Sequence, residues 1–200
     1  MNLRTLVFLF AALPFTAAAQ PDYFPLHVGN QWVYRQVGRV AGAPVVVDIP
    51  RTETFNNQTY SVVRGLGEST LYLRMAENGT LFAYDPETRQ EGVWAAFSMP
   101  EGERFRTVVD PCSNTAVVQS RNVRVTVPAG EFTNALTIHY PAANCADAGL
   151  SADAFVPYIG LVERESITIA GPRYLRLVYA RVGGVTVLSE PEVEIGRAHV

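Results

Sequence analysis

The stretch Arg121–Tyr140, RNVRVTVPAGEFTNALTIHY, predicts two β-strands joined by a tight turn. Valines at alternate positions from 123 to 127 face one way and polar residues face the other, which is the period-two pattern of a half-buried strand. The run Pro128-Ala129-Gly130 supplies a fixed φ, a small residue and a position that tolerates positive φ, as turns require. An apolar face resumes at Phe132, so the return strand begins there.

The same alternation recurs along the rest of the chain. Residues 70–76 alternate apolar and polar side chains, and Asn78-Gly79 behind them is a strong short-range hairpin signal. We expect about ten or eleven strands joined mostly by hairpins. No window shows a sustained helical period, so the fold class is all-β: an antiparallel meander forming a curved sheet or half-barrel, with a β-sandwich or a closed barrel as alternatives.

Composition and the N-terminus point to an exported protein. A short basic segment, an apolar run and the small residues Ala17-Ala18-Ala19 make residues 1–19 a signal peptide, and no later stretch is long enough for a transmembrane segment. We therefore expect one β domain over residues 20–190, located in the periplasm or outside the cell. The net charge of −3 argues against a nucleic-acid partner.

The last residues do not follow the strand pattern. The end of the chain, EIGRAHV, back-translates readily into a common sequencing-adapter read. We treat 191–200 as a tail and expect its last six or seven residues to be foreign to the natural protein.

Cys112 and Cys145 are the two cysteines of the chain, and each lies in turn-like sequence. Export permits oxidation, so we expect a disulfide between them; the alternative is two unrelated thiols. Two cysteines without paired histidines do not form a ligand set, so we predict no metal and no cofactor.

Three motifs resemble a family of uncharacterised exported bacterial β-proteins. The opening Tyr23-Phe24-Pro25-Leu26 with Gly29-Asn30, Trp32 and Tyr34 is similar to a recurrent FPLxxGNxWxY start. Two later pieces are similar to the VPAGxF and GLVxRE motifs, which assign structural turns to Pro128, Gly130 and Gly160. The resemblance implies no activity. The fold class also resembles, at a distance, the periplasmic lipoprotein-carrier half-barrels (LolA- and LolB-like), by analogy of fold alone.

Aromatic residues fall on many of the predicted strands and are candidates for a ligand pocket. Strand alternation could place several of them on one concave face, as in pockets for apolar or sugar ligands; the other reading is that they fill the core. The candidates are Trp32, Tyr34, Tyr72, Trp94, Tyr174 and Tyr179.

Signatures of catalysis are absent from the sequence. No GxSxG elbow, SxxK motif or Cys–His arrangement occurs, and His27 and His139 lie far apart with no ligand or acid at a useful spacing. The leading hypothesis is an exported, non-enzymatic binding module for an apolar ligand or an envelope component. The first alternative is a structural or protein-interaction module, and the second is a glycan hydrolase. A filled core with an exposed strand edge would favour the interaction module, and two facing carboxylates would favour the hydrolase.

Overall fold

The computed structural model describes residues 20–39, 42–141 and 145–188, and every regular element in these ranges is a β-strand. In chain order the strands are β1 Gln31–Gly38, β2 Val45–Phe55, β3 Gln58–Arg64, β4 Leu71–Met75, β5 Thr80–Asp85, β6 Gln90–Ala96, β7 Arg104–Asp110, β8 Ser113–Val127, β9 Gly130–His139, β10 Gly149–Val156, β11 Gly160–Thr168, β12 Gly171–Val182 and β13 Val185–Leu188. The all-β prediction is confirmed.

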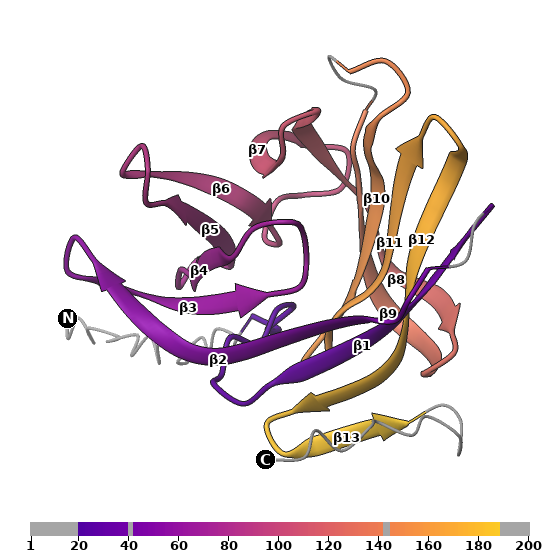
Figure 1. The fold of residues 1–200 in the computed structure, drawn as a ribbon, viewed down its shortest axis with the longest axis horizontal. Coiled ribbons are helices and arrows are strands. Elements are labelled where there is room, and N and C mark those ends of the chain that lie inside the picture. Colours follow the sequence, from indigo (N-terminus) through magenta and orange to yellow (C-terminus); the bar gives the residue numbers. More distant parts are fainter. Residues whose placement is uncertain (1–19, 40–41, 142–144, 189–200) are drawn as a thin grey trace, which may run out of the picture.

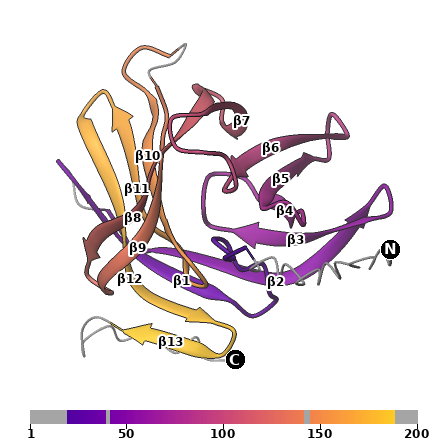
Figure 2. The ribbon, with the colours of Figure 1, turned by 180° about the vertical axis from the view of Figure 1, so that it is seen from behind.

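The strands form one antiparallel meander that curls into a nearly closed barrel. The order across the sheet is β6-β5-β4-β3-β2-β1-β12-β11-β10-β9-β8-β7, with β13 paired to β12 off this path. Each strand pairs with the next along the chain except β6 and β7, and β1 also pairs with β12, in a register that runs from Gln31 opposite Arg181 to Gly38 opposite Arg173. One wall therefore contains β2–β6 and the other β8–β12 (Figures 1 and 2). The barrel remains unsealed between β6 and β7.

The hairpin of β8 and β9 has the predicted alternation. Val123, Val125 and Val127 are partly or fully buried, whereas Asn122 and Arg124 are exposed. Pro128 and Ala129 form the turn, and Gly130 adopts a φ of 145°. The tip then folds onto β12, because the Ala129 N–H donates a 2.8 Å hydrogen bond to the Leu177 carbonyl.

Aromatic rings fill the centre of the barrel. Phe24, from the segment that precedes β1, lies 5.7 Å from both Trp32 and Trp94 and 6.4 Å from Phe155, measured between ring centroids. These four side chains are at most 2% exposed, so the rings are packed almost completely out of contact with solvent. Because they come from the N-terminal segment, β1, β6 and β10, the same cluster joins the two walls.

Candidate functional site

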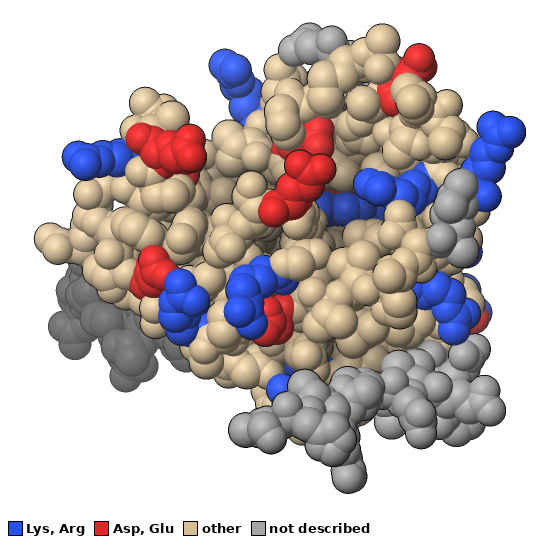
Figure 3. Space-filling model, viewed as in Figure 1, with Lys and Arg blue, Asp and Glu red and all other residues tan. Residues whose placement is uncertain are grey.

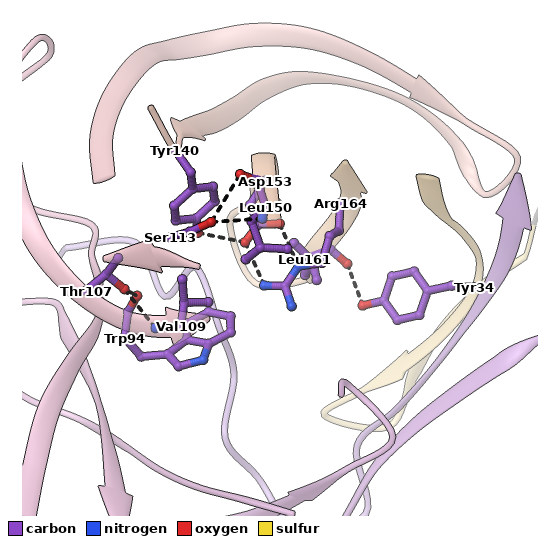
Figure 4. A network of polar contacts seen from close by, with 10 residues as sticks. All are labelled: Tyr34, Trp94, Thr107, Val109, Ser113, Tyr140, Leu150, Asp153, Leu161 and Arg164. Atoms are coloured by element: carbon purple, nitrogen blue, oxygen red, sulfur yellow. Dashed lines mark hydrogen bonds and ion pairs between the residues drawn. The ribbon is translucent and has the colours of Figure 1, made fainter. Parts of the chain in front are cut away.

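A charged pair is buried inside the barrel, in the wall of β10 and β11. Asp153 and Arg164 lie opposite each other in the β10–β11 register. The Arg164 guanidinium donates from Nε to Asp153 Oδ1 at 2.8 Å and from Nη2 to Oδ2 at 2.7 Å (Figure 4). Asp153 is 1% exposed and Arg164 8%, so this bidentate pair is almost fully removed from water. A buried charge needs such a partner to remain ionised.

Two tyrosines complete the polar network. Tyr140 donates its hydroxyl to Asp153 Oδ2 at 2.8 Å, and Tyr34 donates to the Leu161 carbonyl at 2.8 Å. Burial raises the pKa of both phenols well above the ordinary value, so both remain protonated at neutral pH. Burial alone would lower the pKa of Arg164, but the Asp153 carboxylate together with Tyr140 and Tyr34 raises it overall, and the guanidinium remains charged.

Trp94 connects this network to the seam strand β6. Its ring lies under the Arg164 guanidinium, with 5.3 Å between Cζ and the ring centroid, in cation–π geometry. Its indole Nε1 is buried and finds no hydrogen-bond acceptor among the described residues. An orphaned buried donor is unusual and costs free energy. Trp94 therefore places an unsatisfied polar group in an otherwise satisfied core.

The seam is closed by side chains rather than by a strand ladder. Within the described ranges no backbone hydrogen bond joins β6 to β7. Between Arg106 and Asp110 the register of β7 with β8 shifts. There Thr107 donates its hydroxyl to the Trp94 carbonyl at 2.8 Å, and its Oγ1 accepts the Val109 N–H at 3.1 Å. A bulge of this kind redirects a strand, here toward β6.

Gly92 of β6 makes the close approach of Val108 across the seam feasible. A Cβ at position 92 would stand 2.5 Å from Val108 Cγ1, which is shorter than real Cβ contacts. Glycine is therefore required for this packing. Two contacts therefore join β6 to β7: the Thr107–Trp94 hydrogen bond, called the Thr107 latch below, and the packing of Val108 on Gly92. The backbone edges that β6 and β7 turn toward each other are not hydrogen-bonded to one another.

Two shallow hollows lie at the surface. One, of about 310 Å³, lies between the β1–β2 connection and the β11–β12 turn. The other, of about 380 Å³, lies beside the disulfide and is lined by Ser113, His139 and Tyr140 among others. Acidic and basic side chains are interspersed over one face of the molecule (Figure 3). Partly exposed ion pairs of the protein include Arg74–Glu91 and Arg176–Glu163.

The aromatic candidates do not converge on a single face. Trp32, Tyr34 and Trp94 are each 1% exposed and belong to the central cluster. Tyr72 packs edge-on to Phe55 at 5.0 Å in an aromatic group apart from that cluster. The two remaining candidates lie on β12: Tyr179 belongs to a small separate cluster, and Tyr174 bonds to Glu165. Contact with a ligand stays a prediction for each of them.

The motif residues have structural contacts that explain their types. Trp32 donates its Nε1 hydrogen to the Ile159 carbonyl at 2.7 Å. Gly160 has a φ of 107°, and a Cβ there would lie 3.3 Å from Trp32 Nε1. Asn30 donates to the Pro25 carbonyl and accepts the Gly183 N–H. The opening motif thus contacts the turn between β10 and β11 and the turn between β12 and β13.

The predicted disulfide is present. Cys112 and Cys145 are joined, with 5.3 Å between their Cα atoms, and both described cysteines are accounted for. The bond links the β7–β8 turn to the connection before β10. Among the described residues no group of three or more His, Cys, Asp or Glu side chains could hold a metal ion. The described part of the chain also contains no helix long and apolar enough to cross a membrane.

Sequence reasoning missed the ion pair and the seam. Asp153 lies in the run SADAFV, whose small residues do not show the alternation that predicts a strand, although the run belongs to β10. Arg164 was noted only as a residue of the GLVxRE motif. One signal was available: a charged residue at an inward position of an apolar strand. The seam contacts of Gly92 and Thr107 had no local signal, since they depend on which strands become edges.

Comparisons with known proteins align two solved structures with this chain at low sequence identity. No family model matches the chain, and no curated protein is similar to it. A "putative lipoprotein" from Parabacteroides distasonis aligns at 14% identity and a TM-score of 0.45, covering 78% of this chain and 97% of the other. A "putative exported protein with YmcC-like fold" from Bacteroides fragilis aligns at 15% identity and a TM-score of 0.46, covering 79% and 98%.

Proposed function

We propose that this protein is an exported, non-enzymatic module that docks on another protein through the strand edges at the seam. The main observation in support is the seam: β6 and β7 lie next to each other, but no backbone hydrogen bond between described residues joins them. Strand edges of this kind accept an added strand from a partner. The signal-peptide prediction and the Cys112–Cys145 disulfide support export.

The chemistry of β7 suggests which kind of strand it accepts. Arg104 and Arg106 are exposed on this edge strand and have no ion pair with a described residue. An extended partner segment with acidic side chains at alternate positions would complement them. Neighbouring strands stand about 4.8 Å apart, so a strand inserted between β6 and β7 needs roughly twice that spacing and must open the Thr107 latch.

The test uses a seven-residue peptide of alternating Glu and Val, added to the chain from Gln20 onward. Strand addition should raise the protection of β6 and β7 amides in hydrogen exchange. Arg104→Glu with Arg106→Glu should weaken binding at least tenfold. The control is the same peptide with alternate backbone nitrogens methylated, which keeps the charge but cannot extend a ladder. Equal binding of both peptides, or of neither, would contradict docking through a strand edge.

An apolar ligand inside the barrel is the second candidate function. The observation in its favour is the orphaned Nε1 of Trp94, which would suit a ligand carrying a hydrogen-bond acceptor. Against it, the central rings are at most 2% exposed, and they line neither of the two hollows described above. Native mass spectrometry on protein exported to a periplasm and purified without detergent separates the two candidates. A reproducible mass released on denaturation supports the ligand, and a clean apo mass supports the docking module.

A further inference from the structure

Exposed apolar side chains gather at one corner of the barrel, away from the seam. Eight large apolar side chains of the described residues are exposed, and three of them, Val37, Ile167 and Ile169, belong to the end of β1, the end of β11 and the β11–β12 turn. Ile169 is 92% exposed, the highest value among the eight. Single exposed apolar residues are common, but a cluster at adjoining strand ends indicates a contact surface.

The strand register brings these residues together. Val37 lies opposite Tyr174 on β12, and Ile167 of β11 lies opposite Pro172. Arg164, between Glu163 and Glu165 on β11, points into the barrel, so Ile167 belongs to the outer face by alternation. The outer ends of β1, β12 and β11 therefore carry Val37, Pro172 and Ile167, with Tyr174 and Glu165 paired in the adjacent row.

The turn that carries Ile169 is fixed by hydrogen bonds. Thr168 donates its hydroxyl to the Gly171 carbonyl at 2.8 Å and accepts the Ala170 N–H at 3.2 Å. Gly171 has a φ of 102°, which suits glycine. The turn thus holds an isoleucine at its apex, in water, where the fold gains nothing from it.

Two arginines flank this corner. Arg39 and Arg173 are exposed, line the hollow of about 310 Å³, and form no ion pair with a described residue. Of the acidic residues on the outer face of β11, Glu163 is ion-paired with Arg176, whereas Glu165 accepts a hydrogen bond from the uncharged Tyr174 hydroxyl. The β11–β12 turn and the β1–β2 connection project at the same end of the molecule (Figure 1).

We propose that this corner inserts into the surface of a lipid bilayer that contains anionic headgroups. Ile169 enters the boundary between headgroups and acyl chains, Tyr174 lies at headgroup level, and Arg39 and Arg173 bind lipid phosphates. An apolar apex flanked by arginines suits this role, because cationic side chains are attracted to the anionic surface while the apolar group is buried.

The experiment is co-sedimentation of the chain from Gln20 onward with vesicles of phosphatidylglycerol and phosphatidylethanolamine, compared with phosphatidylcholine alone. Binding should occur on the anionic vesicles and fall as salt increases. Ile169→Ser should lower the partition coefficient about tenfold. Arg39→Gln and Arg173→Gln should each lower it about fivefold at low salt. Val185→Ser, at an exposed valine on β13, is the matched control and should leave it unchanged.

Three results would overturn the proposal. The first is no binding to the anionic vesicles, and the second is binding that Ile169→Ser leaves unchanged. The third is a concentration-dependent dimer, seen by light scattering, that Ile169→Ser abolishes, because a second copy would then cover the corner. All variants lie on the surface, and far-ultraviolet circular dichroism checks that each remains folded.

Discussion

Removing one member of a buried ion pair costs more than removing both, and Asp153 with Arg164 should behave in this way. The carboxylate keeps its burial when the guanidinium is removed, so an unpaired charge is left in the core. Tyr140 alone cannot neutralise it. The intact pair therefore adds little net stability, but each member is needed as long as the other is buried there.

We expect Arg164→Met to lower the free energy of unfolding by about 3–5 kcal/mol. The double variant Arg164→Met with Asp153→Leu should recover most of that loss, because no charge remains to desolvate. Urea unfolding of the chain from Gln20 onward measures both. Arg176→Met, which breaks a partly exposed pair with Glu163, is the control and should cost less than about 1 kcal/mol. An Arg164→Met variant as stable as the control would refute the argument.

At the scale of elements, side-chain and covalent links fasten β7 and its turn. The bulge between Arg106 and Asp110 takes β7 toward β6, and the Thr107 hydroxyl joins it to the Trp94 carbonyl. Beyond the bulge, the disulfide fixes the β7–β8 turn to the connection before β10. Ser113, at the start of β8, adds hydrogen bonds to both the N–H and the carbonyl of Leu150. An edge strand that lacks one neighbour is held by these links instead.

Replacing both cysteines, Cys112→Ser with Cys145→Ser, should lower the free energy of unfolding by roughly 3–4 kcal/mol on the chain-entropy model. The estimate follows from the separation of 33 residues between the two cysteines. Urea unfolding with and without reductant provides the measurement. Reductant should destabilise the wild type by a similar amount and leave the double variant unchanged. A double variant that matches the oxidised wild type would show that the bond does not constrain the unfolded chain.

At the scale of the whole molecule, one hydrophobic cluster includes residues from both walls of the barrel. Leu73 and Leu81 from one wall and Phe155 and Leu161 from the other belong to it, and Phe24 lies among the central rings. Both described walls therefore contribute side chains to the same hydrophobic core. The open seam therefore does not divide the molecule into two independently stable halves.

We expect unfolding in urea to be a single cooperative transition. The two tryptophans report from β1 and β6, whereas far-ultraviolet circular dichroism reports on all strands, so the two curves should coincide. Thr107→Val should shift both midpoints together. An earlier fluorescence transition would show that the wall of β2–β6 opens separately.

Local alternation was enough to predict the all-β class, the antiparallel hairpins and many of the strands. The Asn78-Gly79 turn does join β4 to β5, and the predicted alternation of β8 is observed. The disulfide followed from export and cysteine count. These features depend on residues near one another in sequence, because side-chain alternation and turn conformation are properties of a few consecutive residues.

The tertiary structure alone decided the closure of β1 on β12, the seam, the ion pair and the separate locations of the aromatic candidates. Pairing Gln31 with Arg181 and bringing Thr107 to Trp94 depend on how twist and bulges accumulate around the whole sheet. A short sequence pattern does not contain the twist and register shifts accumulated over the other strands. The sequence therefore determined which strands form and how they alternate, whereas the packed barrel determined which residues meet, because contacts across a sheet are set by register summed over every strand between them.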